Sequence, residues 1–304
     1  MEASRFTSPA PVKQTHASSG VRQLVADYVT LTKPRVQLLL LLTTVATMEI
    51  AGSPSVGLIL LTLLGGYLSA GGAGAVNHWY DRDIDARMAR TANRPIPSGR
   101  VSPHAALIYG FSLQIASFLL LSLTVNVLAA SFALLGFLGY VFVYTFWLKR
   151  TTPQNIVIGG AAGAVPPLVG WVAVTGSFDP AALYLFAIVF YWTPPHFWAL
   201  SLRMKDEYAA VGVPMLPVVR GEDETRRQIT LYSFLLVAVT FLPFAGRLFD
   251  GIYAVCAALL GGWFLFLAVR LQRHPDRASA LKLYLFSMLY LALLFGAMVA
   301  DVKL

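Results

Sequence analysis

Hydrophobic and polar positions are arranged along this chain in long blocks. Apolar runs of about 20 residues recur, and each is long enough to cross the roughly 30 Å hydrocarbon core of a bilayer as an α-helix. The pattern therefore predicts an all-α, polytopic membrane protein with about nine transmembrane helices. The runs cover residues 36–52, 56–78, 104–124, 128–147, 155–175, 181–202, 229–247, 251–270 and 280–300.

A polar segment precedes the first run. Residues 1–30 are rich in serine and include prolines, which is typical of a flexible tail, and we expect the transmembrane domain to cover 31–304. The tail lacks the apolar core and cleavage site of a signal peptide. Its serine-rich, acid-poor composition is compatible with a transit peptide and equally with the tail of a bacterial protein.

If successive apolar runs cross the membrane in opposite directions, most basic residues fall in connections on the same side of the membrane. That side holds the tail and the two long loops 79–103 and 203–228, whereas the other holds little more than Arg247 and Lys303. The positive-inside rule then places the N-terminus in the cytoplasm and the C-terminus on the opposite side. We expect a bacterial plasma membrane, with the mitochondrial inner membrane as the alternative.

The composition agrees with a lipid environment. Hydrophobic residues make up 57% of the chain and charged residues 12%, about half of what a soluble domain carries. The net charge of +8 is explained by charge bias between the two sides, so we expect no nucleic-acid partner. Cys256 is the only cysteine, which excludes a disulfide framework and a thiolate metal site.

The most informative polar segment begins where the second run ends. Asn77, Asp81 and Asp85 are spaced i, i+4 and i+8, so on a helix their side chains share one face. Amide and carboxylate oxygens together with phosphate oxygens suit Mg²⁺, and these three residues are the predicted metal ligands. Asp83 lies on another face, where pairing with Arg82 or Arg87, or local capping, is the stronger interpretation.

Basic side chains follow this motif on the same side of the membrane. Guanidinium groups bind phosphate oxygens in a bidentate manner, so they predict a diphosphate site. The alternative is that they anchor the loops to anionic lipid headgroups. The predicted diphosphate-binding residues are Lys33, Arg35, Arg90, Arg94, Lys149 and Arg150.

The sixth run contains Pro194 and Pro195, followed by His196, with Trp192 and Trp198 on either side. Two prolines remove helical hydrogen bonds and predict a kink. A histidine at membrane depth marks a functional site as a rule, and imidazole is a common iron ligand. The alternative is that the histidine binds a carbonyl that the kink frees.

Other polar and small residues give weaker signals. Asp206 and Glu207, just after the sixth run, are predicted to hold a second metal ion, and His78 is a weaker candidate than His196 for an iron ligand. Glycines and prolines make the fifth run thin and bent. They permit close helix packing or, alternatively, leave room for a large planar ligand.

Seven segments between residues 28 and 220 resemble the UbiA-type intramembrane prenyltransferases. Within that family they are most similar to the haem branch, the protohaem IX farnesyltransferases or haem O synthases. The segments are Leu31-Thr-Lys-Pro-Arg-Val36, Asn77-x-x-x-Asp81-Arg-Asp-Ile-Asp85, Arg90-Thr-x-x-Arg94-Pro95, Tyr144-Thr-x-x-Leu-Lys-Arg150, Asn155-Ile-Val-Ile-Gly-Gly160 through Pro166-Pro167, Trp192-Thr-Pro-Pro-His-Phe-Trp198 and Gly212-Val-Pro-Met-Leu-Pro217.

This resemblance implies a prenyltransferase domain whose helices surround a central cavity. It implies Mg²⁺ as cofactor, farnesyl diphosphate and haem b as substrates, haem O and diphosphate as products, and a haem A synthase as a candidate partner. Catalytic roles would fall on Asn77, Asp81, Asp85 and Lys149. His196, Trp192 and Trp198 would bind haem, and Tyr144 would help the tryptophans to shelter an allylic cation. The wider family carries a second D-x-x-x-D, whereas Asp206 and Glu207 are adjacent here.

Two other functions fit parts of the pattern. A prenyltransferase of the same fold could act on hydroxybenzoate or a quinone precursor, although a small phenol needs no iron ligand. A secondary transporter also uses broken helices and polar groups within the membrane. Here, however, the charged motifs lie at one membrane edge, which favours the transferase.

Overall fold

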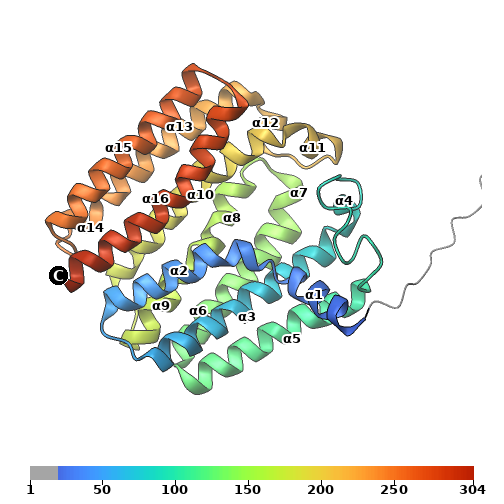
Figure 1. The fold of residues 1–304 in the computed structure, drawn as a ribbon, viewed down its shortest axis with the longest axis horizontal. Coiled ribbons are helices and arrows are strands. Elements are labelled where there is room, and N and C mark those ends of the chain that lie inside the picture. The colour runs from blue at the N-terminus through green and yellow to red at the C-terminus, as the bar shows by residue number, and fades with distance from the viewer. Residues whose placement is uncertain (1–19) are drawn as a thin grey trace, which may run out of the picture.

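The computed structural model describes residues 20–304, so most of the predicted tail lies outside the described part of the chain. Over that part the protein is helical throughout, without strands (Figure 1). Val21–Leu31 form the helix α1, so the last part of the predicted tail is helical. The buried Asp27 carboxylate fixes this helix through Arg100, whose Nε lies 3.0 Å away.

Nine helical crossings, three of them interrupted or extended, account for the nine predicted runs within residues 20–304. Eight are long and apolar enough to span a membrane, and the ninth, α10, is less hydrophobic because it carries tyrosine, proline and histidine. The crossings are α2 (Pro34–Ala51), α3 (Val56–Tyr80), α5 (Pro103–Thr124), α6 (Val127–Leu138) with the π-helix η1 (Gly139–Leu148), α8 (Asn155–Gly163) with α9 (Val165–Thr175), α10 (Pro180–Arg203), α13 (Gly221–Thr240) with α14 (Leu242–Ala245), α15 (Gly251–Arg273) and α16 (Arg277–Lys303). The remaining short helices are α4 (Arg82–Asp85), α7 (Lys149–Thr151), α11 (Lys205–Ala210) and α12 (Leu216–Val219).

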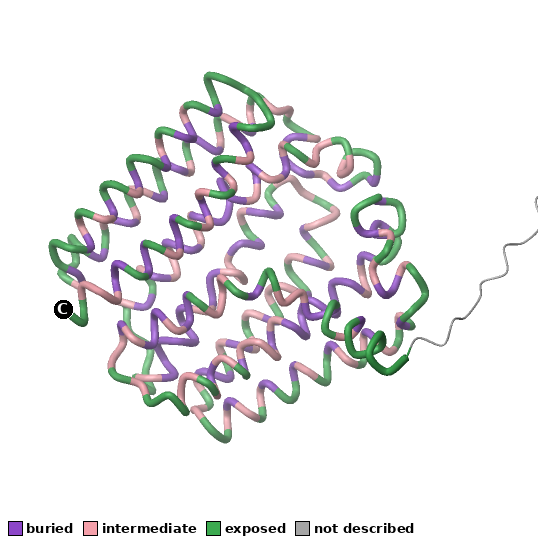
Figure 2. The backbone as a smooth tube through the Cα atoms, in the orientation of Figure 1, coloured by how far each residue is buried: buried purple, intermediate pink, exposed green. Residues whose placement is uncertain are grey.

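The short helices α4, α7, α11 and α12 gather at one end of the bundle, which we call the loop edge (Figure 1). The C-terminus and α14 lie at the opposite end. Exposed positions follow the outer sides of the helices (Figure 2), and large apolar residues such as Leu60 and Leu259 occupy them. An apolar outer surface of this extent is expected where lipid replaces water as the solvent.

One detail of the helices differs from the sequence pattern. α13 begins at Gly221, eight residues before the predicted run, because pairs such as Glu222–Arg226 support a charged first turn. The helix α10 runs from Pro180 to Arg203 with Pro194 and Pro195 inside it, so the kink expected there remains a prediction. The fifth crossing is interrupted at Ala164, as its glycines and prolines suggest.

Close packing of α3 on α5 provides a direct test of this fold. A Cβ atom on Gly72 would lie 2.5 Å from the backbone oxygen of Gly110, whereas one on Gly66 would lie 3.9 Å from Leu41 Cδ2. Gly72→Ala is therefore expected to destabilise the protein by about 1–3 kcal/mol, because a backbone atom cannot move aside cheaply.

The measurement is thermal unfolding in detergent, with Gly66→Ala as the control on the same helix. The control is expected to be neutral or slightly stabilising, because alanine favours helix where space allows it. Equal melting temperatures for the two variants would contradict this packing.

Candidate functional site

The polar motif at the end of α3 keeps its helical register across a small irregularity. Asp81 separates α3 from α4, yet its N–H donates to Asn77 O at 2.9 Å and its carbonyl accepts from Asp85 N at 2.8 Å. The side chains of all three residues are buried. The Asn77 amide donates to Asp81 Oδ2 at 2.8 Å and to Thr145 Oγ1 at 3.2 Å, so the first two predicted ligands are in direct contact.

Each of these three oxygen-bearing side chains contacts a different cation. Lys33 Nζ donates to Asn77 Oδ1 at 2.6 Å, and Arg94 Nη1 donates to Asp85 Oδ2 at 2.7 Å. The ammonium group of Lys149 forms an ion pair with Asp81. The cations come from the start of α2, the loop after α4 and the helix α7, so three separate segments converge on the end of α3. Pairing is what makes buried carboxylates tolerable.

Arg150 extends this cluster toward the surface. Its guanidinium donates to both carboxylate oxygens of Asp83, at 2.9 and 2.7 Å, and lies 4.4 Å from the centre of the Tyr80 ring. It also approaches Asp81 Oδ1 to 3.6 Å. The hydrogen bond from Arg150 lowers the pKa of Asp83 below its usual value. The predicted ion pair of Asp83 thus exists, but its partner is Arg150 from α7 and not Arg82 or Arg87.

Lys33 and Arg35, both predicted to bind diphosphate, differ in their surroundings. Lys33 has a left-handed backbone conformation (φ 54°), which directs the chain into α2. Burial, together with the charges of Arg94 and Lys149, lowers the pKa of the Lys33 ammonium to about 7. Arg35 is exposed, and no ion pair joins it to another described residue.

The chemistry of the motif fits a metal ion that is shared with a ligand. Asp81 Oδ1 is buried and has no hydrogen-bond partner among residues 20–304. Two carboxylates and one amide oxygen are hard ligands of the type that Mg²⁺ takes, usually with phosphate oxygens or water completing the shell. No three His, Cys, Asp or Glu side chains of the described chain are grouped so that they could hold a metal alone.

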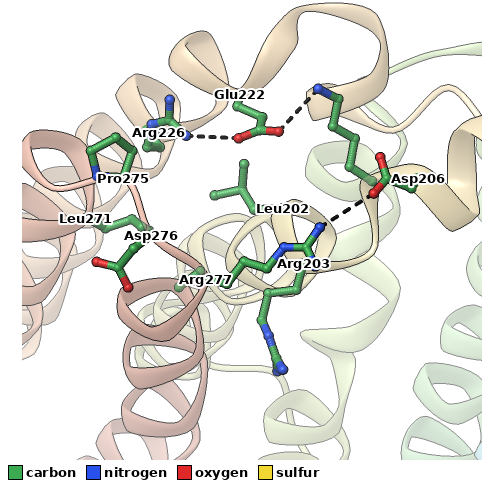
Figure 3. Close-up of a pocket in the computed structure, with 11 residues that line it drawn as sticks. Leu202, Arg203, Asp206, Glu222, Arg226, Leu271, Pro275, Asp276 and Arg277 are labelled. Carbon is green, nitrogen blue, oxygen red and sulfur yellow. Dashed lines mark hydrogen bonds and ion pairs between the residues drawn. The ribbon is translucent and has the colours of Figure 1, made fainter.

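The second predicted metal pair faces other partners. Asp206 Oδ2 lies 3.5 Å from Arg277 Nη2, and both side chains are largely exposed (Figure 3). Glu207 Oε2 lies 4.0 Å from Arg90 Nε, a contact that joins the two long loops. A cavity of about 150 Å³ lies beside Asp206, between α10, α13 and α16 (Figure 3). The structure therefore does not bring Asp206 into contact with the motif on α3.

His196 lies in a second polar cluster, formed with α16. Its Nδ1 is 2.6 Å from Ser287 Oγ, and its ring stacks between Trp192, at 4.2 Å, and Tyr284, at 4.8 Å. Trp192 Nε1 donates to the carbonyl of Ser287 at 2.7 Å. The partner of the imidazole is thus a hydroxyl on another helix, and not a carbonyl that the two prolines free.

Ser287 and Tyr284 were not among the predicted site residues. The only signal was a serine and a tyrosine three residues apart within the last apolar run, a spacing that puts them on one helix face. Trp198, predicted beside His196, instead packs edge-on against Tyr232 of α13 at 5.1 Å. His78 is buried next to Asn77 on α3, and its Nδ1 has no partner in the described chain.

The helix α8 lies between the two clusters (Figure 1) and packs against both η1 and α10. A Cβ atom on Gly159 would meet Tyr144 of η1 at 2.4 Å, and one on Gly160 would meet Thr193 of α10 at 3.0 Å. At these two positions the small residues serve close packing. Tyr144 is held against α8, while Thr145 and Lys149 face the motif on α3.

The sequence model of the UbiA prenyltransferase family matches residues 38–294, which is most of the chain and includes the motif on α3 and the cluster around His196. The chain belongs to the UbiA prenyltransferase family. Its fold agrees with this assignment: it resembles that of a UbiA homolog from Archaeoglobus fulgidus bound to DMAPP and Mg²⁺, with a TM-score of 0.71 over 90% of this chain and 99% of the other. The two sequences are 18% identical, so this likeness concerns the fold alone.

Relatives within the UbiA family are much closer in sequence. The protoheme IX farnesyltransferase of Chloroflexus aurantiacus is 54% identical over 96% of this chain. The chain spans about half of that relative's length (51%). The protoheme IX farnesyltransferase of Rhodopseudomonas palustris strain BisB5 is 50% identical over 91% of this chain and 90% of its own length.

Proposed function

We propose that this UbiA-family chain transfers the farnesyl group of farnesyl diphosphate to the 2-vinyl group of haem b, giving haem O and diphosphate. The names and the 50–54% identity of the protohaem IX farnesyltransferase relatives support the choice of acceptor and donor. The main structural support for a diphosphate-dependent reaction is that Lys33, Arg94 and Lys149 converge on the oxygen-bearing motif of α3.

In this proposal Asn77, Asp81 and Asp85 are the residues that would hold Mg²⁺. The buried Oδ1 of Asp81, which accepts no hydrogen bond from residues 20–304, supports this assignment, as does the Mg²⁺ that accompanies a prenyl diphosphate in the Archaeoglobus homolog. When bound, the metal ion neutralises charge on the leaving diphosphate. Asp206 and Glu207 pair with Arg277 and Arg90 and not with the motif of α3, so we propose that this motif alone builds the metal site.

The cations of the cluster stabilise the charge that develops as the farnesyl C–O bond breaks. Lys149, Arg94 and Arg150 lie within contact distance of the motif carboxylates and are placed to bind the departing phosphate oxygens. Fixed donors aimed at developing charge are often the largest single contribution to catalysis. The apolar surroundings keep water from capturing the farnesyl cation before the acceptor does.

The acceptor then supplies the electrons of the new bond. The π electrons of the haem vinyl group form a C–C bond to the farnesyl cation, which leaves a cation on the neighbouring vinyl carbon. Water adds there and releases one proton, giving the hydroxyethylfarnesyl side chain. Tyr144 and Trp192 are the aromatic side chains we propose for sheltering the farnesyl cation, since Trp198 packs away from His196.

The proposed location is a bacterial plasma membrane with the loop edge in the cytoplasm. The loop edge carries the basic loops and lies opposite the C-terminus (Figure 1), which agrees with the positive-inside rule. A haem A synthase, which would consume haem O, is the partner that this function predicts.

An assay with purified protein separates the possible acceptors. Labelled farnesyl diphosphate would be supplied with haem b or 4-hydroxybenzoate, in Mg²⁺ or in EDTA, and products resolved by chromatography. We expect label in haem O alone, with release of diphosphate abolished by EDTA and restored by added Mg²⁺. Label in the benzoate, or turnover in EDTA, would overturn the proposal.

A further inference from the structure

The hydroxyl of Ser287 lies between two groups that could both accept a hydrogen bond. Its Oγ is 2.6 Å from the carbonyl oxygen of Tyr284 and 2.6 Å from Nδ1 of His196. A hydroxyl has one hydrogen to donate, and a carbonyl oxygen can only accept. Two oxygens at 2.6 Å with no hydrogen between them would repel, so the serine hydrogen points to Tyr284. The hydrogen between Ser287 and the imidazole must then belong to Nδ1.

This assignment fixes the neutral tautomer of His196. With hydrogen on Nδ1, the other ring nitrogen, Nε2, carries a free lone pair. Nε2 makes no hydrogen bond to any residue of the described chain, yet it is not among the fully enclosed polar atoms without a partner. Nε2 is therefore not fully enclosed by the described residues.

The orientation of the ring is fixed as well. Trp192 covers one face at an interplanar angle of 20°, and Tyr284 stacks on the ring at 27°. Trp192 is itself tied to α16 by its bond to the Ser287 carbonyl. The direction of the Nε2 lone pair is thus set by packing between α10 and α16, before any ligand binds.

We infer that Ser287 is a positioning residue, which holds His196 in the Nδ1–H form so that Nε2 ligates the iron of the porphyrin acceptor. This inference rests on the proposed function, because that function makes an iron porphyrin the acceptor. Histidines that bind metals generally donate their second ring N–H to a fixed acceptor, which sets the tautomer and raises the basicity of the ligating nitrogen. Ser287 Oγ is that acceptor here.

The test compares two side chains of nearly equal shape, Ser287→Thr, which keeps the hydroxyl, and Ser287→Val, which lacks it. Each protein is titrated in detergent with ferric haem b and with metal-free protoporphyrin IX, following the Soret absorbance and, for haem, the EPR spectrum. Ser287→Val is expected to bind ferric haem about 10-fold more weakly, with an altered spin-state signal, since loss of such a partner commonly costs 10–100-fold. Its affinity for metal-free protoporphyrin IX should not change.

Ser287→Thr is expected to resemble the wild type, and Ser287→Ala, which adds no volume, to resemble Ser287→Val. If Ser287→Val weakens both porphyrins equally, or neither, the positioning role is overturned. Farnesyl transfer by the wild type is measured in parallel. If the wild type forms haem O but binds ferric haem and metal-free protoporphyrin IX equally tightly, the role of Ser287 and His196 is wrong and the proposed function stands. If the wild type binds ferric haem more tightly but forms no haem O, the proposed function is wrong and the iron contact stands.

Discussion

Asp81→Asn is expected to lower the rate of haem O formation by at least about 100-fold. The substitution keeps the shape of the side chain but removes the charge that pairs with Lys149 and the buried oxygen that accepts no hydrogen bond within the described chain. Both losses weaken the binding of a divalent cation at the place where the diphosphate departs. The measurement is turnover in membranes, normalised to the amount of folded protein.

The matched control is Asp83→Asn, two residues away in the same loop. Asp83 is more than half exposed and pairs with Arg150 at the surface, where an ion pair contributes at most about 1 kcal/mol. Its activity is expected to stay within a few-fold of the wild type. If Asp81→Asn retained wild-type turnover, or if the two variants lost activity equally, the assignment of the metal site to Asp81 would be wrong.

Lys149→Met is expected to impair both catalysis and folding. Asp81 is almost fully buried, so removal of its closest cation leaves only the longer contact with Arg150, at 3.6 Å, and is expected to cost up to about 3–5 kcal/mol of stability. The same change removes a cation from the leaving diphosphate, and we expect the turnover number to fall by about 100-fold. Thermal unfolding and steady-state kinetics in detergent report the two effects separately.

The double variant Asp81→Asn/Lys149→Met distinguishes pairing from a general loss of packing. Without the carboxylate no buried charge is left unpaired, so the double variant should be more stable than Lys149→Met alone while remaining inactive. Additive losses of stability would show that the two side chains do not interact as the structure has them.

The features that the sequence predicted well are those that depend on neighbours along the chain. The nine apolar runs became nine crossings because each must satisfy its own backbone hydrogen bonds in lipid. Asn77 and Asp81 meet because their four-residue spacing is a property of one helix. The close approach of α8 to its neighbours likewise follows from glycines within one segment.

Contacts between distant segments were not foreseen from the pattern alone. Arg150 lies 67 positions from Asp83 in the sequence, and Ser287 lies 91 positions from His196. Neither contact can therefore be predicted from the spacing of residues within one helix. The pairing of Asp206 with Arg277 has the same cause: the position of α16 relative to α10 decides which way this carboxylate turns. These contacts depend on tertiary packing, which cannot be deduced from the pattern of a single sequence.

The number of residues in the π-helix η1 determines where the side chains that follow it point. Its ten residues wind more loosely than an α-helix would, with hydrogen bonds closing over five residues and not four. Lys149 and Arg150 follow directly, so their angular position around the axis depends on how many residues wind in this way. Deleting or inserting one residue between 139 and 148 would rotate both cations away from Asp81 and Asp83. Apart from Tyr144 and Thr145, we therefore expect this stretch to accept substitutions far more readily than changes in its number of residues.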